Sequence, residues 1–125
     1  MKIIIADSLP DSAAALLREQ GWTVDSRAGR PLSELIHDIA DADGLIVRSA
    51  TKVTKELITA APQLRIVARA GTGVDNVDLS AADENGILVV NAPGVNSISV
   101  AEHAWALLLA LARHIAVADS QMKRG

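Results

Sequence analysis

Residues 2–6 read KIIIA, a run of apolar and mostly β-branched residues that ends at Asp7. A run that is apolar on both faces is typical of a central strand in a parallel sheet, because helices cover both sides of such a sheet. Similar short runs recur at residues 44–47 (GLIV), 65–68 (RIVA) and 87–90 (ILVV). A further run at residues 22–25 (WTVD) is less apolar and indicates a strand nearer an edge of the sheet.

The stretches between these runs carry the start and stop signals of helices. Ser8 stands where a capping residue is expected, just before Pro10, and Asn85-Gly86 is a good helix end. The signals predict helices from the Ser8–Pro10 segment to about Glu19, from Pro31 to about Ala40, from Thr54 to before Pro62, and from a cap at Asp78 to Asn85.

The last part of the chain predicts one long helix over residues 98–123. Ser99 and Glu102 have the spacing of a capping box at its start. About 25 residues at ~1.5 Å each give roughly 37 Å, more than a helix covering one small sheet needs. Two interpretations stay open: a helix that covers the sheet and frays at its end, or one that leaves the domain to reach another domain or subunit.

Five strands alternating with five helices predict an α/β fold with a doubly wound, five-stranded parallel sheet. Crossovers in such sheets are right-handed, and the flavodoxin-like strand order 2-1-3-4-5 is the expected one. No repeat, low-complexity tract or linker divides the chain. We therefore expect residues 1–125 to form a single domain.

Composition argues against several classes of protein. The net charge is −3, basic residues are scattered, and Trp22 and Trp105 are the only aromatic residues, so a nucleic-acid surface is not expected. The lack of cysteine excludes disulfides and thiol chemistry and suits a cytoplasmic location. The first residues lack the pattern of a signal peptide. Charged residues and histidines interrupt the apolar stretch 100–118, which predicts a buried helix of a soluble protein rather than a membrane span.

Candidate ligand-binding residues follow the predicted strands, because ligands of doubly wound sheets bind at the carboxyl ends of the strands. Arg48 offers a fork of donors for a carboxylate or phosphate, and Ser49 adds a hydroxyl. Gly71 and Gly73 allow the backbone to approach a ligand closely. Asn96 precedes the positive end of the long helix. Together these loops predict an anion site.

Plainer interpretations exist for each of these residues. Arg48 could be a solvated surface charge, the glycines could form a tight turn, and Asn96 could be a helix cap. The segment 71–76 (GTGVDN) resembles a dinucleotide fingerprint, but it lacks the last glycine and follows the fourth predicted strand rather than the first. The three histidines fall on different predicted helices without the spacing of metal ligands, so no metal site is expected.

Four stretches resemble one known family: GLIVRSATKVT, VARAGTGVDNVDL, GILVVNAPGVNSISVAEHA and the Ala- and Leu-rich helix that follows. They are similar, in order and spacing, to the D-2-hydroxyacid dehydrogenases, above all to members that oxidise D-3-phosphoglycerate in the first step of serine synthesis. The resemblance covers essentially the whole chain. It implies a flavodoxin-like substrate-binding domain that is paired, in full-length members, with a Rossmann domain that binds NAD.

By resemblance, Arg48 and Ser49 bind the charged groups of the substrate, and the backbone of Gly71, Thr72 and Gly73 faces its carboxylate. The resemblance also implies that Thr72 borders the nicotinamide end of NAD and that Asn96 lines the substrate cleft. The Rossmann domain and the catalytic Arg, Glu and His of the family correspond to no part of these 125 residues. We therefore expect no catalytic residue in this chain, no tight binding of NAD, and no activity from the chain alone.

The family also implies a homodimer, with the long helix at or near its interface. Other interpretations are a stand-alone flavodoxin-like binding module and an engineered domain kept only for its fold. A phospho-receiver would have Asp and Lys where this sequence has Arg48 and Asn91, and a flavodoxin would have a phosphate loop after the first strand. Both variants of the module are therefore disfavoured.

Overall fold

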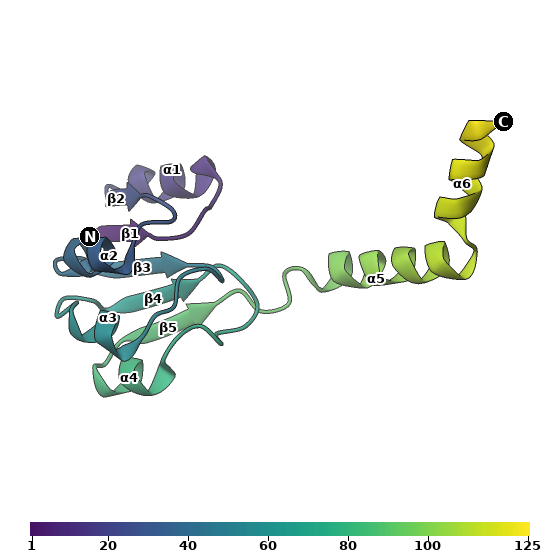
Figure 1. Ribbon diagram of the computed structural model, residues 1–125. Helices are drawn as coiled ribbons and strands as arrows, with labels where there is room; N and C mark the ends of the chain where they lie inside the picture. The colour runs from purple at the N-terminus through teal and green to yellow at the C-terminus, as the bar shows by residue number, and fades with distance from the viewer. The chain divides into compact units, whose positions relative to one another are not determined.

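A computed structural model describes all of residues 1–125 and divides them into two compact units, Met1–Pro93 and Gly94–Gly125. We expected no boundary inside the chain, and the structure has one after Pro93. The first unit is the α/β part, with elements in the order β1 Lys2–Ile5, α1 Asp11–Glu19, β2 Thr23–Ser26, α2 Leu32–Ile39, β3 Gly44–Val47, α3 Lys55–Thr59, β4 Ile66–Arg69, α4 Leu79–Glu84 and β5 Leu88–Asn91 (Figure 1).

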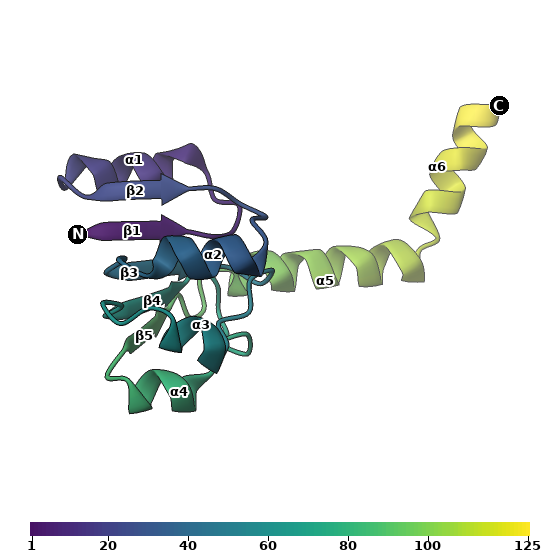
Figure 2. The same ribbon diagram turned by 60° about the vertical axis from the view of Figure 1, so that its left-hand side comes forward.

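The five strands form one parallel sheet in the order β2-β1-β3-β4-β5, which confirms the predicted topology. Each predicted strand lies within one residue of its observed position. In Figure 2 the strands lie side by side with their arrowheads at the same edge. The loops that leave β1, β3, β4 and β5 therefore begin at that carboxyl edge, where the candidate residues of the first unit were expected.

The alternation of side chains along the strands builds a core on each face of the sheet. Ile4, Leu45 and Val67 belong to the larger cluster, which also holds buried side chains of α2, α3 and α4. Ile3 and Ile5 belong to the smaller cluster, together with Ala14 of α1. Helix α1 thus covers one face of the sheet, and the other three helices cover the opposite face.

Two helices of the first unit begin at a residue whose side chain caps the first turn with a hydrogen bond. The Asp78 carboxylate accepts the amide of Ala81, as predicted, and at the predicted start of α3 the Thr54 hydroxyl accepts the amide of Leu57. The prediction for Ser8 was wrong. Helix α1 begins at Asp11 with Pro10 at its N-cap position, so the amide of Ala13 bonds to the carbonyl of Pro10 and not to a serine hydroxyl.

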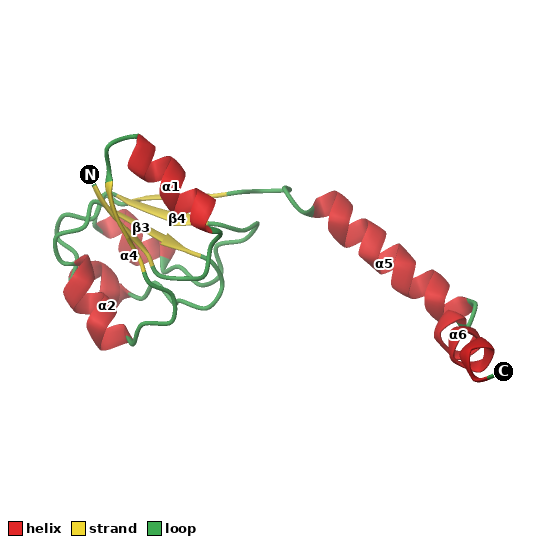
Figure 3. Cartoon of the chain, turned by 90° about the horizontal axis from the view of Figure 1, so that it is seen from above, coloured by secondary structure: helices red, strands yellow, loops and turns green.

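The second unit corrects the prediction of one helix over residues 98–123. It contains α5, Ser97–Ala112, and α6, Ile115–Arg124, which are bent by 60° at the break (Figure 3). His114 adopts left-handed backbone angles, with φ of 51°, and this interrupts the helical hydrogen-bond ladder. The capping box was also wrong, because α5 begins at Ser97 with Asn96 at the N-cap position, which moves Ser99 into the first turn.

The side chains of the second unit are not buried, contrary to the expectation of a buried helix. Trp105 is 63% exposed, and none of the residues of α5 or α6 is buried. No single helix of the chain is both long and apolar enough to cross a membrane, although α5 and α6 reach that length and composition when taken together across their bend.

Candidate functional site

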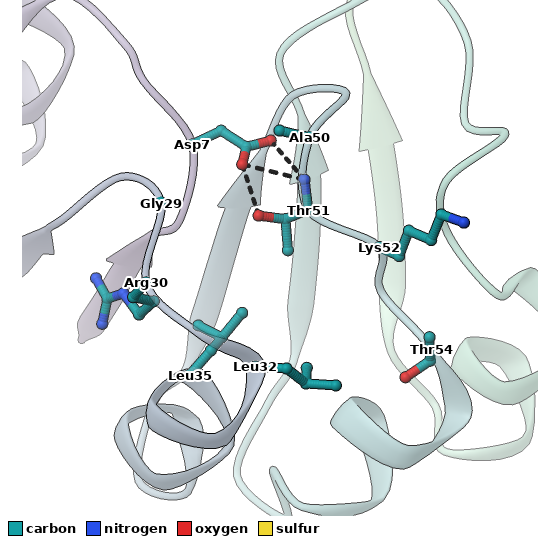
Figure 4. Close-up of a pocket in the computed structure, with 9 residues that line it drawn as sticks. All are labelled: Asp7, Gly29, Arg30, Leu32, Leu35, Ala50, Thr51, Lys52 and Thr54. Atoms are coloured by element: carbon teal, nitrogen blue, oxygen red, sulfur yellow. Dashed lines mark hydrogen bonds between the residues drawn. The ribbon is translucent and has the colours of Figure 1, made fainter.

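The loop between β3 and α3 is held by the carboxylate of Asp7, the residue that stands two places after the end of β1. Oδ2 of Asp7 accepts the amide of Arg48 over 2.6 Å, and its oxygens accept the amide of Thr51 over 3.1 and 3.2 Å. The Thr51 hydroxyl donates a further bond of 2.5 Å to Oδ1. Figure 4 shows this carboxylate directed at Thr51. One side chain that follows the first strand therefore fixes both ends of the segment Arg48–Thr51.

Asp7 is buried, with 6% of its surface exposed. Burial alone would raise the pKa of its carboxyl group. The hydroxyl of Thr51 and the backbone amides of Arg48, Thr51 and Ala50 act in the opposite direction and hold the pKa of Asp7 below its ordinary value. The group is therefore a carboxylate at neutral pH, and it can only accept hydrogen bonds.

A side chain at the end of β4 and one from the loop after it hold the same segment by its carbonyl groups. The amide nitrogen of Asn76 donates to the carbonyl oxygens of Arg48, over 2.8 Å, and Thr51, over 2.6 Å. The guanidinium of Arg69 joins the carbonyl oxygens of Arg48 and Gly73 at 3.3 and 2.8 Å. The loops after β3 and β4 are thus tied into one layer at the carboxyl edge of the sheet.

The loop after β5 is connected to this layer as well. The side-chain amide of Asn91 donates to the carbonyl of Thr72 over 2.6 Å, and the amide of Ala92 donates to the carbonyl of Gly71 over 3.0 Å. Sequence reasoning placed Asn91 at a strand end without giving it a role, and it assigned no role to Asp7, Arg69 or Asn76. A carboxylate directly after a fully apolar strand was the one available signal for Asp7.

The structure brings Arg48, Ser49, Gly71, Thr72 and Gly73 to the same edge of the first unit, as the sequence predicted. The side chains of Arg48 and Ser49 are exposed, and Nη1 of Arg48 donates to the carbonyl of Ser8 over 3.3 Å. Thr72 is exposed too. Their roles toward a ligand remain predictions.

Asn96 belongs to the second unit, and its predicted place in a substrate cleft also remains a prediction. It occupies the N-cap position of α5, and its side chain makes no capping hydrogen bond there. Asn96 is therefore a helix cap by its backbone position, but its side chain does not cap the helix.

The glycine loop does not have the form of a dinucleotide cradle. A side chain at Gly71 would meet Nη1 of Arg69 at 3.1 Å, and one at Gly73 would meet Oδ1 of Asp75 at 3.0 Å. The space beside these glycines is therefore taken by side chains of this chain. The helix that follows is capped by its own carboxylate, Asp78, so the amide of Ala81 is not offered to a phosphate. These residues do not fit a complete NAD site.

Two open hollows flank the Arg48–Thr51 segment. One, of about 410 Å³, is lined by residues of the loops after β1, β2 and β3 and by α2, among them Asp7, Leu32 and Thr51 (Figure 4). The guanidinium of Arg30 points away from the other residues drawn there. The second, of about 400 Å³, includes Ser49 and Asn76 in its wall. No group of three or more His, Cys, Asp or Glu residues could hold a metal ion.

Comparison with known proteins gives a consistent set of relatives. Residues 3–123 match the family model described as D-isomer specific 2-hydroxyacid dehydrogenase, catalytic domain. D-3-phosphoglycerate dehydrogenase of Archaeoglobus fulgidus is 47% identical over the whole chain, which covers 24% of that relative. The chain spans about a quarter of the length of the curated relatives it matches.

Solved structures agree with this likeness. A Thermus thermophilus protein superposes over all of the chain and 41% of its own length, with a TM-score of 0.88 and 35% identity. The NAD+-bound 3-phosphoglycerate dehydrogenase of Entamoeba histolytica superposes over 88% of the chain and 38% of its own length, with a TM-score of 0.78 and 33% identity.

Proposed function

Because the chain belongs to the D-isomer specific 2-hydroxyacid dehydrogenase family, we propose that it is the substrate-binding part of an NAD-dependent D-3-phosphoglycerate dehydrogenase. The reaction would convert D-3-phosphoglycerate into 3-phosphohydroxypyruvate, and we assign it to cytoplasmic serine synthesis. The observation that carries the proposal is the Arg48–Thr51 segment, whose backbone amides and carbonyls are both held by side chains while Arg48 and Ser49 stay exposed.

The chemistry of this segment suits the proposed substrate. D-3-phosphoglycerate carries a carboxylate and a phosphate, and a guanidinium can bind either group through two parallel hydrogen bonds. The Ser49 hydroxyl adds a donor on the same segment. We assign both side chains to the charged groups of the substrate, the backbone of residues 71–73 to its carboxylate, and Asn96 to the wall of the cleft.

Hydride transfer needs a cofactor site and acid–base residues, and residues 1–125 do not provide all of these. The proposed reaction would need NAD as its hydride acceptor, and the glycine loop of this chain does not form a complete site for NAD. We propose that Thr72 borders the nicotinamide end of NAD, and that the remainder of the site and the acid–base residues come from regions that full-length relatives have beyond the matched quarter. On this proposal the chain binds substrate and is inert alone.

A titration with D-3-phosphoglycerate, followed by amide NMR shifts, tests the proposal. We expect the largest shifts at Arg48 and Ser49, and Arg48→Ala to weaken binding by about 1–3 kcal/mol, the scale for losing a hydrogen bond to a charged group. Arg65→Ala is the matched control, because Arg65 is an exposed arginine at the opposite, amino edge of the sheet. Shifts confined to other residues would assign the chain instead to a binding or structural module with another ligand.

A further inference from the structure

We propose that Asp7 is a positioning residue for anion binding: its carboxylate holds the Arg48–Thr51 segment in the form that presents Arg48 and Ser49 to the ligand. The identity of that ligand rests on the proposed function, whereas the positioning role rests on the contacts of Asp7 itself. Asp7 touches no ligand in this proposal, and it acts through the backbone of the segment.

The donors around Asp7 favour a carboxylate over other polar side chains. Three groups converge on its two oxygens: the amide of Arg48, the amide of Thr51 and the hydroxyl of Thr51. An ionised carboxylate accepts all of them and brings no hydrogen of its own. An asparagine could pair its NH2 group with the Thr51 hydroxyl only if that hydroxyl reversed and became the acceptor, and its oxygen would carry no charge. The isosteric amide therefore makes weaker hydrogen bonds to the two backbone amides than the carboxylate does.

Asn76 does not replace Asp7 in this arrangement. It donates to the carbonyl groups of Arg48 and Thr51, whereas Asp7 accepts the amides of the same two residues. When the carboxylate is removed, the amides of Arg48 and Thr51 lose these partners. The adjoining hollow of about 410 Å³, lined by Ala50 and Thr51, gives the released backbone room to move.

Because the Arg48 side chain does not pair with Asp7, the proposal predicts whether anion binding becomes weaker or stronger when the charge of Asp7 is removed. The carboxylate of Asp7 accepts the backbone amide of Arg48, while the guanidinium donates to the carbonyl of Ser8 instead. The positive charge of Arg48 is thus left for a ligand. By Coulomb's law alone, removing the negative charge of Asp7 should strengthen the binding of an anion nearby. The positioning role predicts the opposite.

Asp7→Asn, Thr51→Val and Thr51→Ser should be compared with the wild-type chain, using inorganic phosphate and D-3-phosphoglycerate as probes. Asp43→Asn is the matched control, because Oδ2 of Asp43 accepts the amide of Lys2 over 2.7 Å at the amino edge of the same two strands. Two quantities are measured for each variant: the affinity for the probes and the hydrogen-exchange rates of the Arg48 and Thr51 amides, relative to global stability from urea unfolding.

We expect Asp7→Asn to weaken anion binding about tenfold or more and to speed exchange of the two amides by a similar factor, the scale of a lost bond to a charged group. Asp43→Asn should leave both quantities unchanged. Thr51→Val should give a smaller loss, which Thr51→Ser restores. If Asp7→Asn does not fold, the comparison of Thr51→Val with Thr51→Ser tests the positioning role by itself.

Anion affinity that is unchanged or higher in Asp7→Asn, with exchange at Arg48 and Thr51 no faster than in Asp43→Asn, would overturn the positioning role while the proposed function stands. If the wild-type chain binds neither probe but Asp7→Asn still releases these two amides selectively, the positioning of the segment is supported and the proposed substrate fails instead.

Discussion

Arg30 and Asp38 form an ion pair that the fold largely removes from water. Nη1 of Arg30 lies 2.7 Å from Oδ2 of Asp38, and the two side chains are 3% and 20% exposed. The same nitrogen lies 3.2 Å from Oδ2 of Asp25. A buried guanidinium is tolerated only with such partners, because an unpaired charge is costly to desolvate. The pair therefore ties the loop after β2 to α2.

Truncation of Arg30 should destabilise the first unit. Arg30→Ala leaves two carboxylates partly buried without this partner, and we expect a loss of about 3 kcal/mol in the free energy of unfolding, the low end for breaking a buried pair, since both carboxylates still reach water. Arg27 contacts the same two carboxylates but is 52% exposed. Arg27→Ala should cost clearly less than Arg30→Ala, because exposed ion pairs contribute little to stability, and urea midpoints of the two variants make the comparison. Equal losses would contradict this account.

Stability should fall at acid pH through Asp25. The hydrogen bond from Arg27, opposed by burial and aided by Arg30, lowers the pKa of Asp25 to about 2. A carboxyl group whose pKa is lower in the folded state stabilises the fold above its ordinary pKa of about 3.9, and this contribution is lost as the pH falls toward 2. Urea unfolding at pH 5 and near pH 2 should therefore show a difference between wild type and Asp25→Asn that shrinks at the lower pH. A constant difference would refute the assignment.

The first unit should unfold in one cooperative step. Its sheet is continuous, and Trp22 packs against the smaller core cluster with Ile3 and Ile5. Trp105 lies in the second unit and is exposed, so a Trp105→Phe variant leaves Trp22 as the only fluorescent reporter. Its emission should follow a single sigmoidal urea transition. A broad and gradual change would show that the sheet does not fold as a unit.

The second unit should associate with a second copy of the chain. Helix α5 exposes large apolar side chains on several sides, namely Trp105, Leu107, Leu108, Leu109 and Leu111. Monomers rarely expose apolar patches beyond a few hundred Å², and two-fold symmetry lets one patch cover its own copy. Light scattering should report a dimer in the micromolar range, weakened by Leu108→Lys. A monomer mass that persists into the high micromolar range would exclude this dimer.

The apolar runs predicted the sheet well because the first unit buries them in its own core. Ile4, Leu45 and Val67 are fully buried, as both-faced apolar runs require. The break at His114 could not be predicted in the same way. Residues 98–123 contain neither proline nor glycine, and a left-handed histidine leaves no mark in the hydrophobic pattern.

The candidate site was predicted in its location but not in its internal contacts. Strand ends identify Arg48 and Gly71, because parallel strands bring their carboxyl ends to one edge. The contacts of Asp7, Asn76 and Arg69 depend instead on which side chains turn toward a neighbouring loop, over separations of 41, 28 and 21 residues from Arg48. Local sequence patterns carry no such information.

Two carboxylates also determine how β1 and β3 can align while the chain folds. Asp43 accepts the amide of Lys2 at one end of this strand pair, and Asp7 accepts the amide of Arg48 at the other, each across a sequence separation of 41 residues. A slip of one residue would turn every side chain of a strand to the opposite face and would break both bonds at once. Hydrophobic contact alone specifies the alignment of these apolar, β-branched strands only by face. The two hydrogen bonds, one at each end of the strand pair, favour a single register among those that keep the same face buried.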